Sequence, residues 1–125
     1  MIPESVRIRL RTEMAKLQAY WDSQTDLLVI FGPGGNIIKI SASCETHLGY
    51  HPDEMEGTSY LDYIHPNDLH DTVETGGIMA KEGHKIWTFR NRYRARDGHY
   101  VWLMWYSTPP IRGRIYAVAK YVSLA

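Results

Sequence analysis

The sequence predicts an α+β domain in which five antiparallel strands carry helices on one face. Three observations support this fold class. Apolar and polar residues alternate with a period of two through residues 86–96, two β-rich runs flank a glycine-rich turn within residues 26–41, and short helical segments separate these regions. Strands, then helices, then strands again are typical of α+β architecture. The 125 residues, 44% of them hydrophobic, suffice for one domain with a core.

The composition narrows the class of protein. Cys44 is the single cysteine, so we expect no internal disulfide. No stretch approaches the roughly 20 apolar residues that cross a bilayer, and residues 1–14 do not read as a signal peptide, so we expect a cytoplasmic domain without membrane contact. The net charge is zero, with an acidic middle and a basic last third. Because no nucleic-acid motif accompanies the basic part, we expect no direct binding of nucleic acid.

Residues 1–23 are predicted to form an amphipathic helix ahead of the main domain, which covers residues 24–125. The helix should run from about Glu4 to Trp21. Its apolar residues recur every three or four positions and form one stripe: Val6, Leu10, Met14, Leu17 and Trp21. The stripe is expected to cover either the rest of the same domain or the same stripe on a second copy of the chain. The second alternative predicts a homodimer.

The region after this helix is predicted as a hairpin, several short helices and one longer helix. GPGGN joins the two strands of the hairpin, and it is not a phosphate loop because no Lys-Ser or Lys-Thr follows it. Pro52 and Pro66 each suit the first position of a helix. The second of them, in YIHPNDLHD, begins the longer helix, which reaches about Lys81. His65 and His70 in this stretch lie about 140° apart around a helix, so we expect no metal site from this pair.

The last third of the chain is predicted as three strands. Residues 86–96 form the first, residues 99–108 the second, and residues 113–123 the third. The second strand is apolar on both faces, which predicts a cover over its outer face as well as its inner one. Its outer residues include Trp102, Met104 and Tyr106. The expected cover is the amphipathic N-terminal helix, from the same chain or from a partner.

The inward faces of the strands and the longer helix are expected to enclose a ligand pocket. We predict that it is lined by Val29, Leu69, Val73, Phe89, Asn91, Tyr93, Leu103, Trp105, Ala117 and Ala119, with Trp87, Val101 and Ile78 on the same inward faces. Asn91 and Tyr93 are the polar inward groups. Because buried polar groups need partners, each should either bond the helix side or contact a ligand. The alanines leave room for a small apolar or aromatic molecule.

Three segments of the chain carry a family resemblance: LVIFGPGGNIIKIS, HLGYHPDEMEGTSYLDYIHPNDL and FRNRYRARDGHYVWLMWYSTPPIRGRIYAVAKYVS. Together they extend over residues 27–123, and they include LGY-x-PDE-x-x-G, IHP-x-D and YR-x-x-DG-x-Y-x-W. In these motifs the chain resembles the PAS family with its C-terminal PAC portion. The resemblance implies a sheet of strand order 2-1-5-4-3 and a sensory or dimerisation module that is not itself a catalyst. It also implies an output through a histidine kinase, a cyclic-dinucleotide enzyme or a transcription regulator.

One departure from the family pattern concerns the output. Many PAS domains end their last strand in Asp-Ile-Thr before an output helix, whereas Tyr121-Val122-Ser123 stands here and two residues follow. We therefore expect the output domain to lie outside this chain, with its identity open.

The cofactor is likewise open, and the domain is expected to have none or to bind a small ligand instead. The region of the flavin-binding Asn-Cys-Arg-Phe signature reads GTSYLDY here, without a cysteine, which argues against covalent flavin; Cys44 lies earlier and is expected to pack in the core. The resemblance leaves a haem sensor as an alternative, with His70 on the longer helix as the iron ligand. No nucleophile–base pair, metal spacing or phosphate loop indicates an enzyme.

Overall fold

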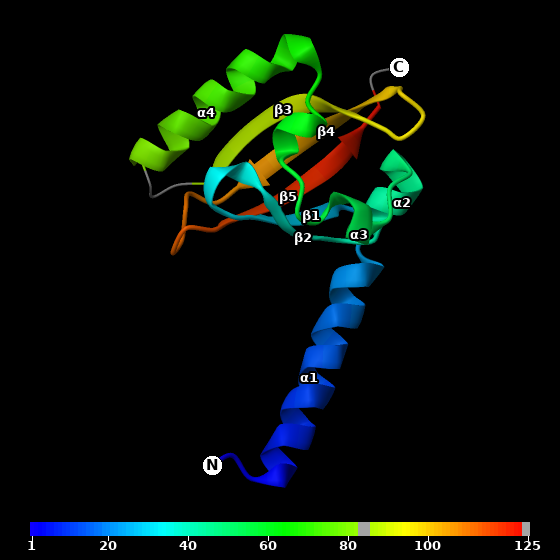
Figure 1. Ribbon diagram of the computed structural model, residues 1–125, viewed down its shortest axis with the longest axis vertical. Coiled ribbons are helices and arrows are strands. Elements are labelled where there is room, and N and C mark those ends of the chain that lie inside the picture. The colour runs from blue at the N-terminus through cyan, green and yellow to red at the C-terminus, as the bar shows by residue number, and fades with distance from the viewer. Residues whose placement is uncertain (83–85, 124–125) are drawn as a thin grey trace.

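The computed structural model of this protein describes residues 1–82 and 86–123. Its centre is a five-stranded antiparallel sheet with the strand order β2-β1-β5-β4-β3 (Figure 1). This order confirms the one that the family resemblance implies. The strands are β1 (Leu27–Phe31), β2 (Ile37–Ile40), β3 (Trp87–Arg94), β4 (Tyr100–Ser107) and β5 (Ile115–Val122).

The helices between β2 and β3 lie over one face of the sheet, as the α+β prediction requires (Figure 1). They are α2 (Ser43–Leu48), α3 (Pro52–Met55), the 3-10 turns η2 (Tyr60–Asp62) and η3 (Pro66–Asp68), and the longer helix α4 (Leu69–Glu82). A further 3-10 turn, η1 (Pro33–Gly35), joins β1 to β2.

The two His-Pro pairs mark where α3 and η3 begin, and the histidine is the capping residue in each. His51 Nδ1 accepts a hydrogen bond from the N–H of Asp53 at 3.1 Å, and His65 Nδ1 accepts one from the N–H of Asn67 at 3.0 Å. The proline that follows each histidine occupies the first helical position, as predicted. The cluster of polar residues in YIHPNDLHD is therefore first of all a helix entrance.

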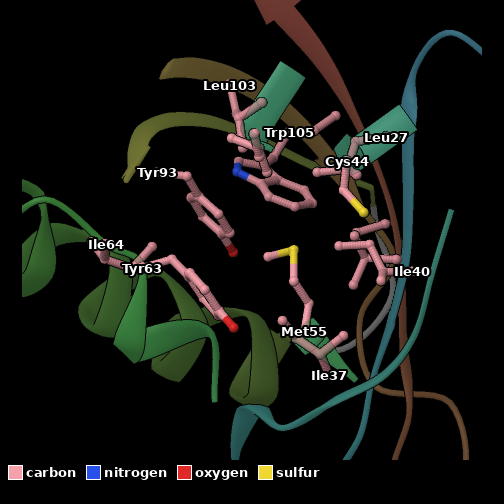
Figure 2. Packing of buried hydrophobic residues seen from close by; sticks show 14 residues of the cluster. Leu27, Ile37, Ile40, Cys44, Met55, Tyr63, Ile64, Tyr93, Leu103 and Trp105 are labelled. Atoms are coloured by element: carbon pink, nitrogen blue, oxygen red, sulfur yellow. The ribbon is translucent and has the colours of Figure 1, made fainter. Parts of the chain in front are cut away.

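The hydrophobic core lies between the inner face of the sheet and the short helices. Its largest fully buried side chains include Trp105, Tyr93, Met55 and Leu103 (Figure 2). Cys44 is also fully buried, and burial is the main reason why the pKa of its thiol is raised to about 12. This cysteine therefore packs in the core, as expected, and stays protonated at neutral pH.

Helix α1 (Glu4–Ser23) projects away from the rest of the domain, and none of its residues is buried (Figure 1). In the predicted stripe, Leu10, Met14 and Leu17 are 49%, 66% and 68% exposed. Trp21, at the end of the helix, is half-buried, and Lys39 Nζ lies 4.8 Å from the centre of its ring. Apart from Trp21, the stripe leaves its own domain uncovered, so cover of the same domain is wrong for the other members of the stripe. Among the described residues, no helix has both the length and the apolar character that crossing a membrane requires.

The outer face of β4 is shielded partly by arginines of β3, and Trp21 at the end of α1 lines a hollow on this face of the sheet together with Leu28 and Tyr106. The guanidinium carbons of Arg90 and Arg92 lie 5.6 and 4.8 Å from the centre of the Trp102 ring. Trp102 and Met104 are consequently half-buried, while Tyr106 is 41% exposed. Cover by the N-terminal helix of a partner chain stays a prediction.

Candidate functional site

A cavity of about 90 Å³ lies between α4 and the inner face of the sheet. Its wall is largely aromatic and consists of Phe31, Tyr60, Phe89, Tyr93 and Trp105. The other residues that line it are Gly35, Thr72, Gly76, Met79, Asn91, Ser107 and Ile115. None of the described residues that line this cavity has a charged side chain. Its surface therefore suits a neutral, mainly apolar molecule.

The strand residues of the predicted pocket all face inward, but they fall into two groups. Four of them line the cavity: Phe89, Asn91, Tyr93 and Trp105. The other four are buried in the adjoining core, each at most 4% exposed: Val29, Leu103, Ala117 and Ala119. The alternation of the strands therefore predicted their inner faces correctly, whereas the cavity occupies only part of these faces.

The predicted inward face of α4 is wrong. Leu69, Val73 and Ile78 are 40%, 48% and 40% exposed. The residues that line the cavity from this helix are spaced four and three apart and are small or flexible: Thr72, Gly76 and Met79. The hydrophobic pattern of the helix thus indicates the side that faces solvent, while its inner side is left without large aliphatic groups.

Asp68, just before the first residue of α4, ties this end of the helix to the sheet. Its carboxylate accepts three hydrogen bonds from Arg92 of β3: from the backbone N–H at 2.8 Å, from Nε at 2.9 Å and from Nη2 at 2.7 Å. The two side chains are only 15% and 24% exposed. The hydrogen bonds from Arg92 hold the pKa of Asp68 below its ordinary value. This attachment helps to determine which side of α4 faces the cavity.

Asn91 bonds both layers that enclose the cavity. Its Oδ1 accepts a hydrogen bond from Nε1 of Trp105 at 2.7 Å, and its Nδ2 donates one to Oγ1 of Thr72 on α4 at 3.4 Å. Asn91 is 1% exposed, so these partners replace water. Of the two alternatives that the sequence left open for this residue, a bond to the helix side is the one observed.

Tyr93 differs from Asn91 because its hydroxyl is not used within the protein. The side chain is 2% exposed and lines the cavity. Among the described residues, its hydroxyl has no hydrogen-bond partner. Burial, together with the nearby phenols of Tyr60 and Tyr63, raises the pKa of Tyr93 far above its ordinary value. The group is therefore a protonated hydroxyl that can donate a hydrogen bond to a molecule in the cavity.

Tyr60 and Phe31 form another part of the cavity wall, which the sequence did not indicate. Their rings meet edge to face, with centroids 6.0 Å apart, and Phe31 also packs against Trp105 at 5.8 Å. Gly35 makes this arrangement possible, since its φ is 86° and a Cβ there would lie 2.3 Å from Cε1 of Tyr60. The GPGG turn thus has a second role beyond joining two strands. Its glycine pair, GG, was the available sequence signal for such a close approach.

His70, the candidate haem ligand, lies outside the cavity. Its side chain is 86% exposed, and its Nε2 is 3.2 Å from the Glu74 carboxylate. With Asp71 these residues form an exposed group of metal-ligating types on the solvent side of α4. In the described part of the chain, neither a histidine nor a cysteine lines the cavity. The groups present therefore fit neither a haem iron held by His70 nor a covalently bound flavin.

Comparisons with known protein sequences place this geometry in a family. The family profile of the PAS fold matches residues 37–122. The human basic helix-loop-helix ARNT-like protein 2 is 29% identical over 85 residues, which is 66% of this chain and 13% of that protein. The Drosophila melanogaster aryl hydrocarbon receptor nuclear translocator homolog is 24% identical over 97 residues, or 78% of this chain and 15% of that protein. The chain thus spans about a seventh of the length of these curated relatives.

Solved structures share the fold at low sequence identity. The PAS domain of an HTR-like protein from Haloarcula marismortui has a TM-score of 0.81 at 20% identity, covering 96% of this chain and all of that one. The PAS domain of the Cronobacter turicensis quorum-sensing receptor RpfR, in complex with BDSF, has a TM-score of 0.70 at 13% identity. That match covers 81% of this chain and 97% of the receptor domain.

Proposed function

Because this chain belongs to the PAS family, whose domains are generally non-catalytic sensory modules, we propose that it senses a small molecule for a larger signalling protein. The proposed binding site is the cavity between α4 and the sheet. Its aromatic, uncharged lining is the observation on which the proposal rests, because a pocket of this kind binds a neutral ligand by burial and a few polar contacts. The RpfR domain in complex with BDSF offers a precedent for a ligand in a domain of this fold.

The route from the cavity to the rest of the protein follows from the sheet. Ser107 of β4 and Ile115 of β5 line the cavity, and β5 also pairs with β1, where Leu27 faces Ala119. A ligand that shifts β5 therefore acts on the end of the domain where α1 enters and the chain continues after β5. We propose that an output domain outside this chain receives the signal there, with a histidine kinase, a cyclic-dinucleotide enzyme and a transcription regulator as the candidate classes.

Homodimerisation is the second candidate function, and α1 is the observation that favours it. Leu10, Met14 and Leu17 form an exposed apolar stripe on a helix that projects from the domain. Exposed apolar stripes of this length are uncommon unless they bind a partner. The same stripe on a second copy would bury these three residues. We propose that the partner also covers Tyr106, which is exposed on the outer face of the sheet.

The ligand proposal is tested on protein purified from cells by native mass spectrometry, followed by extraction and identification of any bound compound. We expect a neutral small molecule in the wild type, which is lost in Gly76→Leu because the new side chain enters the cavity. Gly77→Leu, on the adjacent exposed position, should retain it. A wild type that carries nothing, and whose melting temperature responds to no compound in a library of small neutral molecules, would contradict the proposal. A visible absorption band would favour the haem or flavin alternative instead.

A further inference from the structure

Resting on the proposed function, we infer that the ligand is a small neutral molecule with an apolar body and one hydrogen-bond acceptor, which receives its hydrogen bond from the Tyr93 hydroxyl. The sequence left open whether Asn91 and Tyr93 serve the fold or a ligand. The structure separates the two residues, since Asn91 bonds Trp105 and Thr72 while Tyr93 bonds none of the described residues.

The size of the ligand follows from the cavity volume of about 90 Å³. An engineered apolar cavity of about 150 Å³ holds benzene, so by proportion the present cavity of about 90 Å³ holds roughly four non-hydrogen atoms. Gly76 contributes to this space, because a methyl group at its Cα would have no neighbour within 4 Å beyond its own helix. A fatty acid or a nucleotide exceeds this volume.

The charge of the ligand follows from the lining. Its polar members are the hydroxyl groups of Tyr60, Thr72, Tyr93 and Ser107 and the amide of Asn91, with no acid, arginine, lysine or histidine among the described lining residues. An ion would lose its water shell in this site without gaining a counter-ion, which is strongly unfavourable. The site therefore selects neutral molecules.

The polar contact of the ligand follows from the Tyr93 hydroxyl. The neighbouring Tyr63 stacks on Tyr93 with ring centroids 6.1 Å apart, and Figure 2 shows both phenol oxygens directed toward the interior of the cluster. Tyr63 has a partner, Oγ1 of Thr58 at 2.8 Å. Tyr93 has none in the described chain, although it is 98% buried and lines the cavity. Its oxygen is not among the fully enclosed polar atoms without a partner in the described residues, so it is open to the cavity, and an acceptor atom of a ligand can receive its hydrogen bond.

Ser107 is a second buried hydroxyl on the cavity wall, at the opposite end of β4. Tyr93 pairs with Val101 of β4, and Ser107 lies six residues after Val101 in the same strand. Val101 and Ser107 are therefore about 20 Å apart along the strand. A molecule of roughly four non-hydrogen atoms that bonds Tyr93 therefore does not reach the serine backbone position. This distance makes Ser107→Ala a useful comparison variant.

The test uses acetone and isobutene, which each have four non-hydrogen atoms in the same planar arrangement and differ in one position, where acetone has an acceptor oxygen and isobutene a CH₂ group. Each is titrated into the isotope-labelled full chain, and binding is followed by NMR chemical shifts of residues around the cavity. We expect the ratio of acetone affinity to isobutene affinity to be about tenfold higher in wild type than in Tyr93→Phe, the effect of one good hydrogen bond in a buried site. The ratio is compared between variants because acetone also loses its hydrogen bonds to water when it enters the cavity. Tyr63→Phe and Ser107→Ala should keep the wild-type ratio.

Two outcomes would overturn the inference: an affinity ratio that Tyr93→Phe leaves unchanged, and no binding of either probe by the wild type. The first would leave the cavity as a ligand site and remove only the role of Tyr93. The second would also remove the assigned size and polarity, whereas the proposed sensory function is judged separately by the molecule that co-purifies with the protein. If Gly76→Leu binds neither probe, this cavity is the place where the wild type binds them.

Discussion

Tyr63 and Tyr93 are stacked neighbours whose hydroxyl groups have different surroundings, and this difference can be measured at the scale of single residues. Both side chains are buried, at 6% and 2% exposure. Only the Tyr63 hydroxyl has a partner among the described residues, which is Oγ1 of Thr58. Replacing each tyrosine by phenylalanine removes one oxygen and changes little else in the packing.

We expect Tyr63→Phe to lower the free energy of unfolding by about 1 kcal/mol, because it breaks a buried hydrogen bond. Tyr93→Phe should leave the free energy of unfolding nearly unchanged, because the hydroxyl that it removes is open to the cavity and has no hydrogen-bond partner in the described structure. Urea denaturation of the ligand-free protein measures both values. An equal loss in the two variants would mean that the Tyr93 hydroxyl has a partner inside the protein.

Asp68 and Arg92 make the stability of the domain dependent on pH. The hydrogen bonds from Arg92 lower the pKa of Asp68 in the folded state, and an unfolded aspartate has a pKa of about 3.9. The contribution of this pair is therefore complete above the unfolded pKa and is lost as the pH falls through the lower, folded value. Acid should weaken the attachment of α4 to β3.

We expect Asp68→Asn to lower the free energy of unfolding by about 2 kcal/mol at pH 7, since it removes a charge-assisted pair. The difference from wild type should shrink as the pH falls below about 4. Asp71→Asn, at an exposed position on the next turn, is the matched control and should change stability little. Denaturation curves from pH 2 to 7 test this prediction, and a difference that stays constant over that range would argue against it.

At the scale of elements, α4 shows both the reach and the limit of prediction from sequence. Its existence and its end near residue 81 were predicted correctly, as were the inward faces of β3 and β4. A strand alternates strictly, so its pattern has only two possible assignments. The inner face of α4 could not be predicted, because a cavity requires small residues where an ordinary core helix has large ones. Thr72 and Gly76 occupy that face, and Val73 faces outward.

The adjacent glycines of α4 provide a matched pair of substitutions. Gly76 and Gly77 both lie within the helix, and a methyl group at either position would have no neighbour within 4 Å beyond the helix itself. We expect Gly77→Ala and Gly76→Ala each to raise the free energy of unfolding by up to about 1 kcal/mol through helix propensity. Thermal denaturation measures this gain.

The same pair distinguishes a cavity position from a surface position. Gly76→Leu should exclude both acetone and isobutene, and Gly77→Leu should bind them as the wild type does. Equal binding by the two leucine variants would place the bound molecules somewhere other than the cavity. Loss of binding in both would point to a general change in α4 instead of occupation of the space next to Gly76.

At the scale of the whole molecule, α1 was predicted as a helix but not as a projection from the domain. Its periodic apolar residues indicate a stripe, and a stripe does not specify whether it binds its own chain or another. The structure removes the first alternative for all of the stripe but Trp21, because none of the residues of α1 is buried and only Trp21 is described against the sheet. We therefore predict that two copies of the chain associate through the stripe.

We expect the purified chain to be a dimer in multi-angle light scattering, and Leu10→Glu combined with Leu17→Glu to convert it to a monomer. Glutamate preserves helix propensity, so the change acts on the apolar stripe. Thr12→Glu, on the opposite side of α1, is the control and should remain dimeric. A wild type that stays monomeric at high concentration would contradict the proposed dimer, as would a double variant that still dimerises.

The position of β5 has a consequence for how the domain folds during synthesis. It is the last strand in sequence and the middle strand of the sheet, pairing β1 on one side and β4 on the other. On the ribosome, the early hairpin and the late hairpin have no common neighbour until residues 115–122 have been synthesised. The cavity has walls from both halves, with Phe31 before and Trp105 after. A ligand that requires both walls therefore binds only those copies of the domain in which β5 has already joined the two hairpins.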